Sequence, residues 1–389
     1  MNVRTLLKTF SMPLALAGIW LFFIWKLDHD ALLGDGHGGY GRLIFLSPRN
    51  LTQLIVQFSI IGTLALGMFM ILLTGQIDLS AGSGVGLIGG ITSVLIIQQH
   101  WSAPLAMLAA FAGGLALWSL MGTLIVKERI PSFIITLGGM LIFRGFFWMV
   151  IQNATIPVKG LSDNLFSLIT TYYLPANAGF VLAGVVAGAL ALLQWRGRAA
   201  RSAHGLPVPP AGRTWLRLAL IVGAIFFMVD RFNRFNGLPA TFLILSATAA
   251  GVYFLTRHTP FGRYLYAIGG NEEAAVLSGI NVDRVLIGVY VLMGATVAVT
   301  GFMQTAYQGS SSTTVGDLME LDAIAACVIG GTALKGGRGT VWGVLFGTLI
   351  MTSLLNGMDL MAVEPEKRMI ARGIVLVLAV WLDMRLSRP

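Results

Sequence analysis

Residues 51–74 read LTQLIVQFSIIGTLALGMFMILLT, an apolar run in which no side chain carries a charge. About 20 residues at a rise of 1.5 Å per residue span the roughly 30 Å hydrocarbon core of a bilayer. The run is therefore long enough to cross a membrane as one helix. Similar runs recur from Met12 to Leu382, which predicts an all-α fold, a polytopic transmembrane helical bundle.

The composition of the whole chain favours the same class. Of the 389 residues, 56% are hydrophobic and 11% are charged, whereas an average soluble domain has roughly 25% charged residues. A water-soluble fold could not bury that much apolar surface. A transmembrane barrel would show alternating strands of about ten residues, and the sequence lacks this pattern.

We expect about 10–12 spans in one transmembrane domain, residues 1–389, because several runs are short or broken by glycine. Glycines four residues apart, as at Gly343 and Gly347, predict close helix crossings. The candidate spans are 12–27, 51–74, 83–99, 104–126, 131–151, 178–195, 214–230, 240–256, 285–305, 320–333, 341–357 and 369–384.

The distribution of basic residues predicts an orientation. With a cytoplasmic N-terminus, sixteen Lys and Arg residues fall in cytoplasmic segments and seven fall outside. Basic residues concentrate on the cytoplasmic side of membrane proteins, so both termini are expected to be cytoplasmic. The net charge of +9 is thereby attributed to topology rather than to nucleic acid. Arg144 and Arg372, inside spans, are expected to extend toward the membrane interface.

Two polar stretches fall on the cytoplasmic side. Residues 196–213 are rich in Arg and Pro and predict a mobile loop, for which an orientation-setting tether is favoured over a specific binding role. Residues 256–284 form the longest polar stretch.

Residues 271–280 are expected to contain one short helix within that longest stretch. Asn271 is a candidate N-cap, Glu272 and Glu273 would occupy the first turn, and Gly279 would end the helix. Its small apolar face can pack on the chain's own helices or dock in a groove of a partner. That face comprises Ala275, Val276 and Ile280.

Residues 74–84, TGQIDLSAGSG, contain an acidic residue between two apolar spans. A carboxylate is costly in lipid and normally faces a cavity or a partner. The glycines, with Gly82 and Gly84 among them, predict an interrupted helix whose freed backbone groups line a polar cavity. Two interpretations stay open for Asp78: it caps the next helix with help from Ser80, or it contacts the solute.

A second interruption is expected after residue 320. The run 320–333 is too short to cross comfortably and ends in a glycine-rich basic turn with Gly336, Gly337 and Gly339. Leu79-x-x-Gly82-x-Gly84 recurs as Leu334-x-x-Gly337-x-Gly339, which hints at two related halves.

Signatures of catalysis are absent. Residues 331–340 resemble a phosphate-binding loop only loosely, because no Lys follows the last Gly and no strand precedes the loop. The five histidines are scattered, and Cys327 is the only cysteine. We therefore expect no enzyme activity, no metal and no cofactor in this chain.

Three separated segments resemble the membrane permeases of bacterial monosaccharide ABC importers. They are GQIDLSAG at 75–82, FGRYLYAIGGNEEAAVLSGI at 261–280, and ELDAIAA at 320–326 followed by GGT at 330–332 and GGRGTVWG at 336–343. The similarity extends over about residues 51–384. The segment 74–90 and the Arg- and Pro-rich stretch are most similar to xylose-type members, while ribose-, galactose- and autoinducer-type members share most of the motifs.

The resemblance implies a multi-pass protein of the bacterial cytoplasmic (inner) membrane that passes a monosaccharide, xylose or another pentose, by alternating access. It implies three partners: a second permease copy, a cytoplasmic ATP-binding subunit and a periplasmic sugar-binding protein. Glu273-Ala274-Ala275-x-x-x-Gly279 is similar to the core by which importer permeases engage their ATPases. The later Ile and Leu-Pro of that pattern are missing. The similarity shifts the expectation for the short helix from self-packing to docking.

The expected pathway lining consists of polar residues at the first interruption and at the outer end of the ninth span. These residues are Gln76, Asp78, Ser80, Ser83, Gln304 and Thr305. The alternative function is a proton- or sodium-coupled secondary transporter that uses Asp78, Glu320 and Asp322 as ion sites and needs no ATPase. Few acidic residues lie deep within spans, which argues against a proton relay.

Overall fold

The computed structural model describes residues 3–33, 44–158, 164–208 and 210–386, which are almost entirely helical. Within this part the chain forms fifteen helices and four two-residue strands, with β1 paired to β4 and β2 to β3, both antiparallel. The helices are α1 (Val3–Leu33), α2 (Pro48–Leu73), α3 (Ala81–Ile97), α4 (Ala103–Lys127), α5 (Ser132–Val150), α6 (Leu165–Thr171), α7 (Ala176–Ala203), α8 (Ala211–Asn233), α9 (Ala240–His258), α10 (Pro260–Gly270), α11 (Glu272–Leu277), α12 (Val282–Gln308), α13 (Met319–Ile329), α14 (Val341–Leu360) and α15 (Pro365–Leu386). The strands are β1 (Ile156–Pro157), β2 (Tyr173–Leu174), β3 (Leu238–Pro239) and β4 (Ser310–Ser311).

The predicted all-α, polytopic class is confirmed. Each of the twelve predicted spans coincides with one helix, namely α1 to α5, α7 to α9 and α12 to α15. Seven helices in the described residues are long and apolar enough to cross a bilayer: α2, α4, α5, α7, α9, α12 and α14. The second predicted span, residues 51–74, therefore corresponds to one continuous membrane helix, α2.

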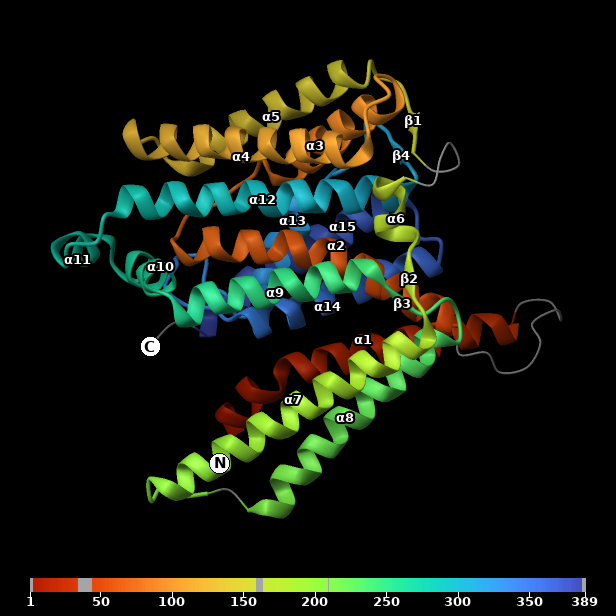
Figure 1. Cartoon of the computed structure of the whole chain (residues 1–389), viewed down its shortest axis with the longest axis vertical. Helices are drawn as coiled ribbons and strands as arrows, with labels where there is room; N and C mark the ends of the chain where they lie inside the picture. The colour runs from red at the N-terminus through yellow and green to blue at the C-terminus, as the bar shows by residue number, and fades with distance from the viewer. Residues whose placement is uncertain (1–2, 34–43, 159–163, 209, 387–389) are drawn as a thin grey trace.

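Helix α2 lies at the centre of the bundle. Its residues from Gly62 to Leu73 are all buried, and it packs against α9, α12, α13 and α14. Residues 62–73 carry no charged side chain, so their burial among these helices leaves no charge without water. Helices α9, α12 and α14 run beside it (Figure 1).

Close crossings of these helices depend on glycine. A side chain at Gly347 of α14 would overlap the Ala326 carbonyl oxygen of α13, and one at Gly343 would overlap the Gly330 carbonyl oxygen. On α3, the Gly89 backbone lies against Thr305 and Gly301 of α12. The prediction that small residues four apart set helix crossings is confirmed at α14.

Helix α13 has only 11 residues, which agrees with the expectation of a partial helix. At 1.5 Å per residue it covers about 16 Å, roughly half of the hydrocarbon core. Residues 312–318 precede it as a series of turns, with left-handed backbone at Gly316 and Leu318. Non-helical backbone occurs at membrane depth only where protein or a water-filled cavity surrounds it.

The two ends of the bundle differ in character. The strand pairs and α6 lie at the right-hand end in Figure 1, and α10, α11 and the C-terminus lie at the left-hand end. The turn between α4 and α5 and the connection between α7 and α8 also lie to the left, so most of the predicted cytoplasmic basic segments share one end (Figure 1).

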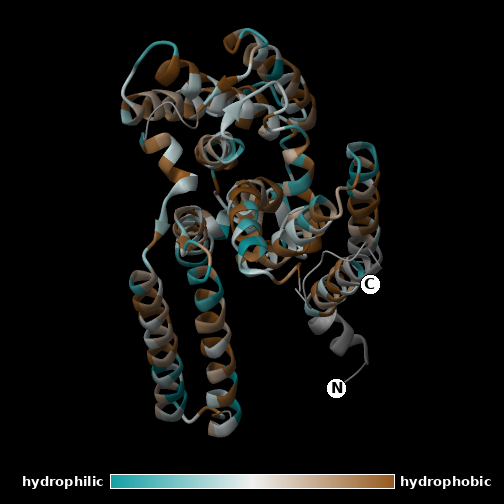
Figure 2. Ribbon diagram, turned by 90° about the vertical axis from the view of Figure 1, so that its right-hand side faces the viewer, coloured by the Kyte–Doolittle hydropathy of each residue, from teal (hydrophilic) through white to brown (hydrophobic). Residues whose placement is uncertain are grey.

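Helices α7 and α8 form a hairpin that leaves the bundle (Figures 1 and 2). The two helices pack on each other, for example through the stacked rings of Phe180 and Phe226, whose centroids are 6.4 Å apart. The predicted mobile loop over 196–213 is shorter than expected, because α7 continues through Ala203 and α8 begins at Ala211. Alanine and arginine in residues 196–203 favour helix, which extends α7 past its apolar part.

Replacing Gly347 by Ala tests the crossing of α13 and α14. The added methyl group would overlap a backbone oxygen, so we expect the free energy of unfolding to fall by about 1–3 kcal/mol. Thermal unfolding of the purified protein in detergent measures the change. Gly188→Ala on α7 is the matched control, since its methyl group would meet open space; equal effects of the two substitutions would contradict the packing argument.

Candidate functional site

A polar cavity of about 260 Å³ lies among α2, α12, α13, α14 and α15. Its lining includes the C-terminal parts of α12 and α14 and the first part of α15, which lie toward the right-hand side of Figure 1. Sixteen residues line it: Gln57, Ile60, Ile61, Gln304, Tyr307, Gln308, Thr314, Gly316, Asp317, Met319, Asp322, Thr352, Leu355, Asp359, Arg368 and Arg372.

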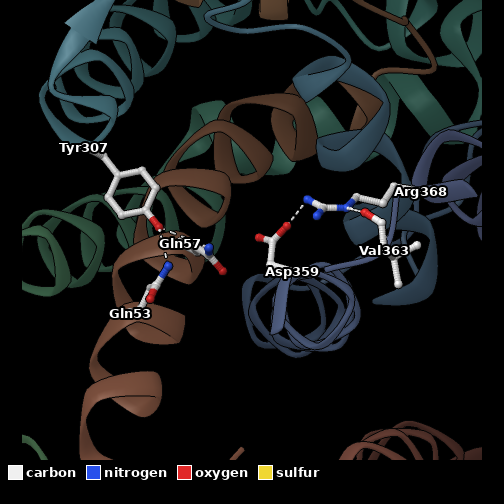
Figure 3. Close-up of polar contacts among 6 residues, drawn as sticks. All are labelled: Gln53, Gln57, Tyr307, Asp359, Val363 and Arg368. Carbon is white, nitrogen blue, oxygen red and sulfur yellow. Dashed lines mark hydrogen bonds and ion pairs between the residues drawn. The ribbon is translucent and has the colours of Figure 1, made fainter. Parts of the chain in front are cut away.

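Amide and hydroxyl groups form one wall of the polar cavity. Gln53 and Gln57, one turn apart on α2, both donate hydrogen bonds to the Tyr307 hydroxyl of α12, at 3.2 and 3.1 Å (Figure 3). Tyr307 thus links the two helices. The Oε1 atom of Gln57 is buried without a protein hydrogen-bond donor, so this wall retains an acceptor.

Paired charges form the opposite wall and the base. Arg368 pairs with Asp359 and donates through Nε to the Val363 carbonyl oxygen at 2.6 Å (Figure 3). Deeper in the cavity, Arg372 Nε lies 3.4 Å from Asp322 Oδ1, and Asp322 is almost fully buried. A buried carboxylate needs such a partner, because leaving it alone costs several kcal/mol.

The two arginines inside spans have acidic partners. Arg144 Nη2 lies 2.9 Å from Asp317 Oδ1, and the Arg144 guanidinium group lies over the Trp148 ring, 5.4 Å from its centroid. Arg372 pairs with Asp322. Carboxylates from distant segments thus pair with both guanidinium groups; that Arg144 and Arg372 extend toward the membrane interface stays a prediction.

This lining suits a neutral polyhydroxylated solute. Amides, hydroxyls and paired charges offer both hydrogen-bond donors and acceptors. Among the described residues, no group of three or more His, Cys, Asp or Glu is placed to hold a metal ion. The cavity can therefore bind and release, and its side chains present no nucleophile paired with a base.

The first interruption is observed at residues 74–80, between α2 and α3, and Asp78 lies at its centre with no exposed surface. Its carboxylate accepts from the Ser80 backbone N–H at 2.8 Å, the Ser80 hydroxyl at 2.6 Å and Trp118 Nε1 of α4 at 2.7 Å. Three donors satisfy most of the carboxylate's capacity. In this arrangement Asp78 fixes the start of α3 to α4.

The expected pathway residues do not all lie together. Gln304 lines the polar cavity, whereas Thr305 is buried against Gly89 of α3. Gln76, Asp78 and Ser80 lie at the first interruption and Ser83 lies in the first turn of α3, all four outside the cavity lining.

The floor of the polar cavity rests on the start of α3. Gly316 lines the cavity, and a side chain on it would overlap the Gly82 carbonyl oxygen. Glu320 also reaches Gly82, because a Cβ there would overlap its carboxylate. The cavity and the first interruption are thus separate, but the floor of the cavity packs on the helix that begins directly after the interruption.

The predicted glycines divide into two groups. Gly82 and Gly84 lie inside helix α3, so the expectation that they interrupt the helix is wrong; they allow close packing against Gly316 and Trp118. Gly336, Gly337 and Gly339 lie in the turn after α13, all with positive φ, as the second interruption requires.

The two interruptions meet the polar stretch 256–284 at one place, which we call the glycine junction (Gly75, Gly269, Gly336 and Gly337). The Gly337 N–H donates to the Leu73 carbonyl oxygen at 3.0 Å, and a side chain at Gly269 would overlap that same oxygen. A Cβ at Gly336 would lie 2.8 Å from both the Gly75 nitrogen and the Gly269 Cα. Three backbones therefore touch with no side chain between them.

Helix α10 is fixed to this junction by a tyrosine. The Tyr266 hydroxyl donates to the Gly339 carbonyl oxygen at 3.0 Å. Burial raises the pKa of Tyr266 above its ordinary value, so the hydroxyl keeps its proton at neutral pH. The protonated hydroxyl can serve as the donor in this contact between α10 and the second interruption.

The predicted short helix is confirmed as α11. The Asn271 side chain accepts from the Ala274 N–H at 2.9 Å, Glu272 and Glu273 occupy the first turn, and Gly279 has φ of +82°. Ala275 is buried against the chain's own helices, while Val276 points outward and Leu277 is 89% exposed. Ile280 is half-buried. The helix thus packs inward through Ala275 and presents a second apolar face.

Several lining residues were not predicted from the sequence. Gln57 lies in an otherwise apolar span, four residues after Gln53. Two glutamines on one face of an apolar helix were a detectable sign of a polar lining. Asp317, Asp359 and Arg368 lie near span ends, where charge is common and therefore uninformative. The exposure of Leu277 had no sequence signal, because it depends on which side of α11 faces the bundle.

Residues 50–380 match the family described as branched-chain amino acid transport system / permease component. The chain is 39% identical over 386 residues to the xylose transport system permease protein XylH of Escherichia coli (strain K12), covering 98% of this chain and 93% of the relative. It is 37% identical over 382 residues to XylH of Haemophilus influenzae, covering 97% and 96%. It is 35% identical over 343 residues to the ribose import permease protein RbsC of Bacillus subtilis (strain 168), covering 88% and 87%. No solved structure matches the chain.

Replacing Asp78 by Asn separates its two interpretations. An amide cannot accept from all three donors, so one buried donor would lose its partner and the free energy of unfolding should fall by about 1–3 kcal/mol. Thermal unfolding measures this change, with Gln76→Ala at the same interruption as a control for local disturbance. A loss of solute transport with an unchanged unfolding temperature would instead assign Asp78 to the pathway.

Proposed function

This chain belongs to the family of branched-chain amino acid transport system permease components, and from this membership we propose that it forms the membrane pathway of an ABC importer for a monosaccharide, xylose or another pentose. It is a multi-pass, non-catalytic transport subunit, and ATP hydrolysis belongs to a separate chain. The observation that carries the proposed substrate class is the similarity to xylose permeases over 98% of the chain.

The polar cavity is the proposed entrance for the sugar. Its amides, hydroxyls and paired charges can exchange hydrogen bonds with sugar hydroxyls, and its volume of about 260 Å³ leaves room for one small solute. Gln304 is the sequence-predicted residue in this lining, and Gln57 faces it from α2. Gln76, Asp78 and Ser80 of the first interruption, and Ser83 of α3, lie outside this lining and would meet the sugar only after a conformational change.

The orientation of the chain follows from its basic residues. The end that carries α10, α11, the C-terminus and most of the basic connections is assigned to the cytoplasm of a bacterial inner membrane. The polar cavity then opens toward the periplasm, where a sugar-binding protein would deliver its cargo. Both termini are cytoplasmic in this assignment.

Helix α11 is the proposed docking element for the cytoplasmic ATP-binding subunit. Asn271, Glu272, Glu273, Ala274, Ala275, Gly279 and Ile280 form its motif, and the outward face of Val276 and Leu277 supplies apolar contact area. A second copy of the permease completes the assembly.

The glycine junction supports a mechanism of alternating access. Movement of α11 is passed to α10, which precedes it and is separated from it by the single residue Asn271, and which is bonded to Gly339 through Tyr266. Because α10 touches the backbone at both interruptions, the C-terminal end of α2 and the N-terminal end of α14 would move together. The sugar itself undergoes no chemical change.

A cysteine in place of Gln304 tests the polar cavity as the pathway. Cys327 is fully buried, so the wild-type protein should react slowly with a charged thiol reagent added outside. The Gln304→Cys protein should react with the reagent. Its ATP-dependent xylose uptake, measured in proteoliposomes that contain the ATPase subunit and the binding protein, should then fall by most of its value. Xylose added before the reagent should protect the cysteine from modification.

Ala154→Cys is the control for this experiment, because Ala154 is exposed in the turn after α5 and lies outside the cavity lining. It should react and retain uptake. Full uptake after modification of Gln304→Cys would contradict the pathway. Uptake by the purified chain without an ATPase subunit would favour the ion-coupled secondary transporter instead.

Replacing Leu277 by Ser tests the docking face. Burying a leucine side chain contributes about 1.5–3 kcal/mol, so its loss should weaken binding of the ATPase subunit about tenfold or more. Titration of the ATPase subunit against detergent-solubilised permease measures the affinity. Leu206→Ser is the matched control, as Leu206 is 56% exposed in the connection of α7 and α8.

Glu273→Ala and Gly279→Ala extend the test, since Ala at a left-handed position strains the end of α11. Both variants should reach the membrane in normal amounts but lose transport-coupled ATP hydrolysis. Intact coupling in all three variants would contradict the docking role of α11.

A further inference from the structure

A groove of about 380 Å³ lies between α7 and α8 near the connection that joins them. Leu190, Leu193, Gln194, Gly197, Arg198 and Arg201 of α7 line it together with Thr214 of α8. The polar cavity is lined by other residues, on other helices. The proposed transport function gives the groove no role.

The sequence of α7 places these side chains on one face. Residues 190, 194, 197 and 201 recur at intervals of three and four, the spacing that aligns positions along a helix. A side chain at Gly197 would meet open space, so the middle of the groove is empty of protein atoms. Arg198 reaches across to α8 and donates from Nη1 to Thr214 Oγ1 at 3.2 Å. Arg201 lies one turn further and is exposed.

The groove lies in a region with a strong excess of positive charge. Arg196, Arg198, Arg201, Arg213 and Arg217 surround the connection, whereas residues 164–229 contain no Asp or Glu. The first acidic residue of α8 is Asp230, near its other end, where it pairs with Arg234. The local field therefore attracts an anion.

The surroundings place the groove at the edge of the bilayer. The flanks of the hairpin are apolar and exposed, including Val181, Val185 and Leu220, and Figure 2 shows brown along the hairpin and teal near its lower end. Trp195, 61% exposed, and Trp215 lie beside the arginines, as tryptophans do at membrane interfaces. From Ala176 to Arg198 the helix rises about 33 Å, close to the roughly 30 Å hydrocarbon thickness.

We propose that this groove binds the headgroup of an anionic phospholipid. The phosphate would contact Arg198 and Arg201, and Leu190 and Leu193, which lie on the membrane side of the arginines, would contact the first part of an acyl chain. Basic pockets between membrane helices bind such headgroups. The adjoining leucines favour a lipid over a soluble phosphate, which has no apolar part to bury.

Native mass spectrometry of the full-length protein in detergent tests the proposal. Phosphatidylglycerol and phosphatidylcholine with identical acyl chains are titrated separately, and phosphatidylglycerol should bind about tenfold more tightly or better. Arg198→Gln with Arg201→Gln should remove most of that preference, while the double Lys variant, which keeps both charges, should retain it. Lys127→Gln with Arg129→Gln, at the same end of the bundle, is the matched control and should also retain it.

Three results would overturn the proposal. The wild-type protein could bind the two lipids equally, which needs no variant to observe. The control pair could lose the preference as fully as the groove pair, which would indicate general charge attraction. Inorganic phosphate, at the concentration of phosphatidylglycerol that half-saturates the protein, could displace the lipid, which would assign the groove to small soluble anions.

Discussion

The contact of three backbones at the glycine junction constrains the rest of the molecule. Leu73 ends α2, Gly269 lies near the end of α10, and Gly337 belongs to the turn before α14; the carbonyl oxygen of the first accepts the N–H of the last. A methyl group on Gly269 would overlap that oxygen. Because backbones are much stiffer than side chains, a displacement of one segment is transmitted to the other two rather than absorbed between them.

The same helices connect the junction to the polar cavity at the other end. Helix α2 carries Gln57 in the cavity and Leu73 at the junction, 16 residues apart, or about 24 Å. Helix α14 begins at Val341, directly after the junction turn, and its Asp359 reaches the cavity. Two continuous helices, α2 and α14, thus connect the glycine junction, where movement of α11 would arrive, to the polar cavity, where the solute would enter. No relay of separate side chains is needed to couple the two places.

Features that depend on local sequence were predictable, and features that depend on distant pairing were not. The twelve spans and the Asn271 cap follow from residues within one helix. The pairs Arg144–Asp317 and Arg372–Asp322 join segments far apart in the chain, so the sequence showed each charge without its partner. Gly82 and Gly84 were misjudged because glycine serves both to break a helix and to let one pack closely, and only the neighbours Gly316 and Trp118 decide between these uses.

The shortness of helix α13 has a consequence for the solute in the polar cavity. Half of this crossing is made by the turns of residues 312–318, whose peptide groups border the cavity through Thr314, Gly316 and Asp317. Peptide groups at that depth are tolerated because protein and the polar cavity surround them, and several are hydrogen-bonded within the turns. In the proposed function, an arriving sugar would replace water molecules that are hydrogen-bonded to this lining. Each sugar hydroxyl would take over hydrogen bonds that water had made, so the net free energy of binding would be small, and so would the cost of release. Such a near-balanced exchange would favour release of the solute as much as its binding.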